Sequence, residues 1–141
     1  MATGTAGSIA RKYHTSQIHY LRADFNVAEV DVSGGVTKTL GTIPAGSIVL
    51  RGMVVVTTAF NWGTNNLIDV GPAADPDGYA TIMSLLTIGN IVFDEMATTN
   101  DQYVTVDTPI YAQMQCTGTA ATTGAGFVIV EFVENLGDMN A

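Results

Sequence analysis

The two histidines and the single cysteine are the residues of this chain best suited to catalysis or metal binding, and their spacing opposes both. His14 and His19 are five positions apart, so on an extended segment they point to opposite faces and cannot share a metal ion or a proton. Cys116 ends an apolar strand pattern and has no histidine partner in the body of the chain, which indicates a buried small hydrophobe. One cysteine also permits no disulfide within the chain. We therefore expect no enzymatic activity, no bound metal and no cofactor.

Three aspartates raise calcium binding as an alternative. Asp69, Asp75 and Asp77 supply the hard oxygen ligands that calcium prefers. However, the bidentate glutamate that follows the glycine in a calcium loop of the EF-hand type is missing after Gly78. The four residues from Asp75 to Gly78, Asp-Pro-Asp-Gly, match a type I turn at each position. Turn formation thus accounts for two of the aspartates without a metal ion.

Four aromatic residues offer a second alternative, because aromatic rings stack on sugars. They are Trp62, Tyr79, Tyr103 and Tyr111. Such residues also cap sandwiches or line protein interfaces, where one end of the ring is apolar and the other is polar. The sequence therefore leaves open a carbohydrate- or calcium-binding β-sandwich module that uses Trp62 and Tyr79 together with the turn residues Asp75 and Asp77.

The distribution of charge excludes several partners. The chain of 141 residues has a net charge of −8, with 47% hydrophobic and only 13% charged residues. All five basic residues lie in residues 1–51, whereas residues 52–141 hold ten acidic residues and no lysine or arginine. A body with this charge repels phosphate backbones, so we expect no nucleic-acid partner. No apolar run reaches the length of a membrane span, so we expect no membrane partner either. The low charge suits a surface that contacts other protein.

Short strand patterns separated by turn residues run through most of the chain. They predict an all-β fold, an antiparallel sandwich or barrel. Residues 25–40 read as a hairpin around Ser33-Gly34-Gly35, and residues 79–89 fit either a short helix or a buried strand. We expect an N-terminal arm over residues 1–24 and a β-sandwich domain over residues 25–141. The remaining strand patterns cover residues 47–60, 67–71, 91–96, 103–106, 109–118 and 126–134.

Residues 43–80, with the pattern IPAG…TTAFN…IDVG…DPDGY, and the closing segment GAGFVIVEFVE at 124–134 carry a resemblance to a known family. They resemble the jelly-roll cement, or decoration, proteins of tailed double-stranded DNA phage capsids. Similar strings occur in β domains of phage head fibres and tails, where the carbohydrate- or calcium-binding alternative would belong. The resemblance implies a jelly-roll sandwich without enzymatic activity.

The same resemblance implies a place and partners. The protein would be made in the host cytoplasm, with which the lone cysteine is compatible. It would then bind the major capsid protein on the outer surface of the virion, at contacts between capsomers, and stabilise the shell. It would act as a homo-oligomer, usually a trimer at three-fold positions and in some members a dimer at two-fold positions.

Two groups of residues follow as candidate contact sites. In the arm, basic and aromatic side chains are concentrated in an otherwise unpatterned segment, and we expect these to bind the capsid: Arg11, Lys12, Tyr13, Ile18, Tyr20 and Arg22. In residues 47–60, apolar residues occur at both parities of a strand, which is more than one solvated sheet face needs. We expect one parity to fill the core, namely Ile48, Leu50, Gly52, Val54, Val56 and Thr58. We expect the other to form a subunit interface, namely Val49, Arg51, Met53 and Val55.

Overall fold

The computed structural model describes residues 18–29, 36–96 and 102–134, which form eight β-strands and one 3-10 helix. The first sheet residues are in β1 (Ile18–Asn26), followed by the 3-10 helix η2 (Val27–Glu29). The remaining strands are β2 (Val36–Ile43), β3 (Ile48–Thr58), β4 (Asn65–Pro72), β5 (Ala80–Ser84), β6 (Gly89–Val92), β7 (Thr108–Thr117) and β8 (Ala125–Val133).

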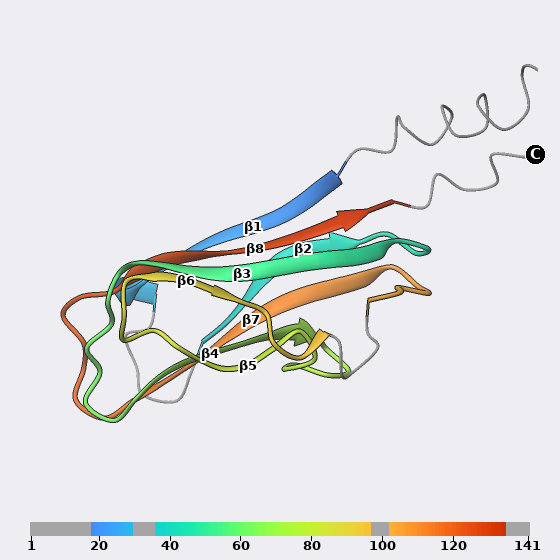
Figure 1. Cartoon of the computed structure of the whole chain (residues 1–141). Helices are drawn as coiled ribbons and strands as arrows, with labels where there is room; N and C mark the ends of the chain where they lie inside the picture. Colours follow the sequence, from blue (N-terminus) through green and yellow to red (C-terminus); the bar gives the residue numbers. More distant parts are fainter. Residues whose placement is uncertain (1–17, 30–35, 97–101, 135–141) are drawn as a thin grey trace, which may run out of the picture.

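The strands form two four-stranded antiparallel sheets, with the orders β1-β8-β3-β6 and β2-β7-β4-β5. Strands from the two ends of the chain pair progressively toward its middle: β1 with β8, β2 with β7, β3 with β6 and β4 with β5. The chain is therefore one long hairpin wound into two sheets, which is a jelly-roll arrangement. Figure 1 shows β1 and β8 side by side along one surface of the molecule. The predicted all-β antiparallel sandwich is confirmed.

The core lies between the two sheets and follows the two-residue period of the strands. Alternate residues of β7 are buried, and so are alternate residues of β8. Cys116 is among them, so the prediction of a buried thiol is confirmed. The buried apolar residues of these two strands are Ile110, Ala112, Met114, Cys116, Val128, Val130 and Phe132.

Three local expectations are resolved by the observed backbone. Residues 79–89 contain no helix: β5 ends at Ser84, and β6 begins at Gly89 after a bend. The predicted turn is present, because the Gly78 N–H donates to the Asp75 carbonyl at 2.9 Å. In the segment 103–106, Tyr103 makes only an isolated bridge with Ile48, so the strand predicted there is wrong.

The expected hairpin over residues 25–40 is also wrong. β1 ends at Asn26 and pairs with β8, while β2 pairs with β7 in the opposite sheet. The boundary expected at residue 24 therefore falls inside a strand, and residues 18–24 belong to the sandwich rather than to an arm. Residues 1–17 and the turn at 33–35 lie outside the described residues.

Candidate functional site

The outer face of the β1-β8-β3-β6 sheet carries several exposed apolar side chains, and it is hereafter called the apolar face. Its side chains alternate with those that enter the core, so they point away from the second sheet. Five of them are more than 40% exposed: Ile18, Tyr20, Ile48, Leu50 and Val92. Contiguous exposed apolar surface of this kind marks protein interaction sites. The remaining apolar members are half-buried: Met53, Val55, Phe127, Ile129 and Val133.

Strand register aligns part of this face into a row. Ile18 of β1 lies opposite Val133 of β8, Val133 lies opposite Ile48 of β3, and Ile48 forms a bridge with Tyr103. Adjacent strands are about 4.8 Å apart, so the row crosses roughly 14 Å of the sheet without an intervening charge. Ile18 is 52% exposed and Tyr103 is 60% exposed. A flat partner surface can therefore cover several apolar side chains at once.

A bulge in β3 changes which of its residues belong to this face. The pairing of β3 with β8 shifts between Val49 and Arg51, so two residues of β3 occupy the space of one. Val49 consequently points into the core and is 1% exposed, and the expectation that it forms a subunit interface is wrong. The bulge reverses the parity at the start of β3, and Ile48 and Leu50, expected in the core, lie on the surface.

Beyond the bulge, β3 follows the expected parity as far as Val56. Thr58, expected in the core, follows a second register shift and is exposed. Val54 and Val56 are buried, while Met53 and Val55 are half-buried on the apolar face. Gly52 is buried beneath the ring of Phe93, which occupies the space that a Cβ atom would need. The structure therefore explains the glycine by the close approach of a side chain.

The charged residues on the apolar face are paired within the chain. Arg51 lies opposite Glu131 in the register, and its Nε forms an ion pair with that carboxylate. Arg22 pairs with Asp24 at 3.1 Å, and its guanidinium lies 3.9 Å from the centre of the Phe127 ring. Exposed ion pairs add little stability, but they leave the face without net charge. Arg51, expected at a subunit interface, has an acidic partner in its own chain.

The residues expected to bind the capsid fall into two groups. Ile18, Tyr20 and Arg22 lie in β1, on the same face as Met53 and Val55. Arg11, Lys12 and Tyr13, like His14, lie outside the described residues. Apart from the buried Val49, the structure thus brings the described members of both predicted sets onto one sheet surface. Sequence reasoning missed Phe127, Ile129 and Val133, although the apolar residues at both parities of 126–134 were a usable signal.

The aromatic platform proposed for sugar binding is not formed. Trp62 is 5% exposed and Tyr79 is 1% exposed, so both belong to the core. Tyr79 stacks against Phe93, with ring centroids 6.4 Å apart. A buried ring cannot stack on a sugar, and this part of the carbohydrate-module alternative is wrong. Tyr103 and Tyr111 lie at different places on the surface and do not replace the lost rings.

The aspartates have structural roles. Asp69 is buried in β4, where one carboxylate oxygen accepts the N–H of Ile82 at 2.6 Å and the other accepts the Gln115 amide. Asp77 accepts a hydrogen bond from the Thr81 hydroxyl at 3.4 Å. Across the described ranges, no group of three or more His, Cys, Asp or Glu side chains is placed to hold a metal ion.

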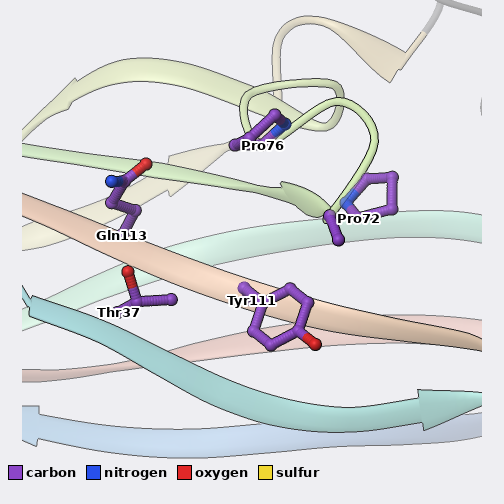
Figure 2. Close-up of a pocket in the computed structure, with 6 residues that line it drawn as sticks. Thr37, Pro72, Pro76, Tyr111 and Gln113 are labelled. Carbon is purple, nitrogen blue, oxygen red and sulfur yellow. The ribbon is translucent and has the colours of Figure 1, made fainter.

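A shallow pocket of about 240 Å³ lies on the outer face of the other sheet. Figure 2 shows Tyr111 and Gln113 projecting from β7 and Thr37 from β2, with Pro72 and Pro76 at the end of β4 and in the following turn. These side chains offer apolar contact and hydrogen bonds. The lining contains no carboxylate, amine, imidazole or thiol.

Two further observations concern the reactivity of the thiol and the presence of membrane-spanning helices. Burial raises the pKa of the Cys116 thiol, and this effect outweighs the opposing hydrogen bond with the Leu67 backbone. The thiol is therefore poorly suited to nucleophilic chemistry. Within the described residues, no helix has the length and apolar character needed to cross a membrane.

Comparisons with known proteins find similarity at the level of the fold. No protein-family model and no curated protein matches the sequence. A chain of the capsid asymmetric unit of cyanophage Pam1 superposes with a TM-score of 0.59 and 16% identity, covering 84% of each chain. A chain of the capsid of Ralstonia phage GP4 superposes with a TM-score of 0.61 and 16% identity, covering 84% of this chain and 85% of that one. A chain of the acid-stable capsid of Helicobacter pylori bacteriophage KHP30 gives a TM-score of 0.47 at 13% identity, covering 84% and 89%.

The first two similarities extend over almost the whole described structure. They show that this chain has a β-sandwich fold of the type found in phage capsids. At 16% identity they define the fold and leave the role of the chain to be argued from its own surface.

Proposed function

We propose that this chain is a structural protein of a phage virion that decorates the outer surface of the capsid. In this role it binds the major capsid protein at contacts between capsomers and stabilises the shell. The observation that carries the proposal is the apolar face, a solvent-facing sheet surface too apolar for a freely soluble domain, on a fold shared with chains of phage capsids.

Stabilisation of the shell would come from the apolar surface that each copy buries and from the number of copies bound. Ile18, Tyr20 and Val92 leave more than half of their surface in contact with water in the free chain. Burial of such side chains gains roughly 25 cal/mol for each Å² of apolar surface removed from water. One copy contributes a modest interface, but a shell binds many copies at equivalent positions. The summed effect opposes the separation of capsomers far more than one contact does.

The two predicted residue sets act together in this proposal. Arg22, Met53 and Val55 share one sheet face, and we propose that this whole face lies against the shell. Arg11, Lys12 and Tyr13 precede β1 in the sequence and extend the contact toward an acidic region of the capsid protein. The protein also associates with further copies of itself.

Co-sedimentation tests the proposal. The purified protein is mixed with shells assembled from the major capsid protein encoded in the same genome. We expect it to sediment with the shells, to saturate at a fixed ratio to the capsid subunit, and to raise the temperature at which shells dissociate. If the protein stays in the supernatant at all ratios, the proposed function is wrong.

A further inference from the structure

The free edge of β1 suggests how two copies of the chain associate. Among the described strands, β1 is outermost in its sheet and pairs on one side only, with β8. The Val27 N–H donates to the Gly124 carbonyl at 2.8 Å, in the same register as the β1–β8 pairing. In an antiparallel ladder the backbone groups of alternate residues point to the same side. The odd-numbered residues of β1 therefore bond to β8, and the even-numbered residues face away from the sheet.

Side chains close one end of this edge. The ammonium group of Lys38 donates to the Asp24 carbonyl and also pairs with Glu29 at 2.7 Å. The other carboxylate oxygen of Glu29 accepts the Asn26 N–H at 3.0 Å. These bonds, hereafter called the clamp, occupy the Asp24 carbonyl and the Asn26 N–H, two outward backbone groups at the C-terminal end of β1. Clamping of this kind protects a sheet edge from added strands.

The clamp leaves a short open segment. Among the described residues, none bonds to the outward N–H and C=O groups of Ile18, Tyr20 and Arg22. Two of these three residues carry exposed apolar side chains, with Tyr20 63% exposed. The edge is thus open for three backbone positions on one side of the clamp, and an added strand must pair there.

We propose that the open edge pairs, antiparallel, with the same edge of a second copy about a two-fold axis at Tyr20. In this register Ile18 lies opposite the partner's Arg22, and Tyr20 lies opposite the partner's Tyr20. All three open positions then pair with open positions. A register centred on Leu21 instead places Ile18 opposite the clamped Asp24 of the partner subunit. The clamp therefore disfavours registers shifted toward Asp24, and the register centred on Tyr20 is the one that pairs all three open positions. The dimer then has a continuous eight-stranded sheet.

Charge favours a second copy at this edge over other parts of the surface. The described residues hold ten acidic and three basic side chains, so two copies repel each other over most of their surface. β1 carries one acid and one base, Asp24 and Arg22, which are already paired with each other. Arg51 and Glu131 cancel in the same way on the neighbouring strands. The open edge therefore adjoins a face without net charge. Two copies with the same net charge repel each other least when they associate there.

The two-fold axis at Tyr20 is perpendicular to the sheet, so both copies present the apolar face on the same side of the dimer. This leaves the face free for the shell contact proposed above. The edge pairing concerns the association of the chain with itself, and it does not require that shell binding be correct.

The mass of the full chain in solution tests the pairing first. A dimer has a mass of 2 × 14.8 = 29.6 kDa. The variant Tyr20→Pro removes one outward N–H that β8 does not use, so the strand is retained while its free edge is broken. The control Tyr20→Thr removes the ring but keeps the N–H. We expect the dimer dissociation constant to rise at least tenfold more in Tyr20→Pro than in Tyr20→Thr. A trimer, a monomer at all concentrations, or equal effects of both variants overturns the pairing.

Disulfide trapping tests the register without relying on proline. Residues at the axis have Cα atoms about 5.5 Å apart, within the range that a disulfide spans. Oxidation of Tyr20→Cys should therefore yield a covalent dimer. Asp24→Cys is a control on the same strand and face that lies away from the axis and should stay monomeric. The native Cys116 is fully buried and should not contribute. Equal cross-linking of both variants, or of neither, contradicts the proposed register.

Discussion

Alanine substitution of two adjacent residues tests the bulge that defines the apolar face. Val49 is 1% exposed, and Leu50 is 41% exposed. Val49→Ala removes two methyl-sized groups, which costs about 1.6 kcal/mol at roughly 0.8 kcal/mol for each group. The cavity left in the core raises the total loss to about 2–3 kcal/mol. Leu50→Ala removes more atoms, but Leu50 lies on the surface and its loss leaves no cavity in the core, so we expect a loss below about 1 kcal/mol.

Thermal unfolding followed by circular dichroism measures the difference. At about 3 °C for each kcal/mol in a domain of this size, Val49→Ala should lower Tm by about 6–9 °C and Leu50→Ala by less than about 3 °C. Strict alternation along residues 47–60 predicts the opposite order, because it places Leu50 in the core and Val49 outside. Equal losses, or a larger loss in Leu50→Ala, refute the bulge and the apolar face derived from it.

Three further substitutions and one series of pH values test other local features of the fold. Gly52→Ala should destabilise the fold by about 1–3 kcal/mol in urea unfolding, because the new methyl group meets the ring of Phe93. Asp69→Ala should lower the free energy of unfolding by about 1–3 kcal/mol, because the part-buried N–H of Ile82 loses its acceptor. Ile82→Gly should be neutral or stabilising, since Ile82 has a φ of +51° and is 62% exposed. The pKa of Cys116 is raised in the folded state, so its contribution to stability is full below the unfolded pKa and falls as pH rises above it. Urea unfolding of the wild type and Cys116→Ala between pH 7 and pH 10 should show the steeper decline in the wild type.

Local patterns in the sequence were sufficient for the two strands with the clearest alternation. The alternation at 109–118 and 126–134 predicts β7 and β8 within a residue or two, because each strand buries one parity in the core. The turn at Asp75 to Gly78 follows from the same residue types that its backbone hydrogen bond requires.

Strand pairing and register could not be predicted in the same way. The residues around Ser33 to Gly35 favour a hairpin, yet β1 pairs with β8, about 100 residues further along the chain. That choice depends on which sheet faces bury most apolar surface together, and no local window contains this information. The bulge at Val49 is likewise set by the register of β3 against β8. This bulge decides which of the predicted interface residues lie in the core.

The binding of one surface variant to capsid shells tests the central claim most directly. Met53→Glu places a charge on the half-buried part of the apolar face, and Thr37→Glu places the same charge on the exposed outer surface of the other sheet. Both variants are measured by co-sedimentation against the wild type, after circular dichroism shows that they fold. We predict saturable binding of the wild type and of Thr37→Glu, and binding at least tenfold weaker for Met53→Glu. Equal binding of the two variants, or no binding of the wild type, contradicts the proposed role of the apolar face.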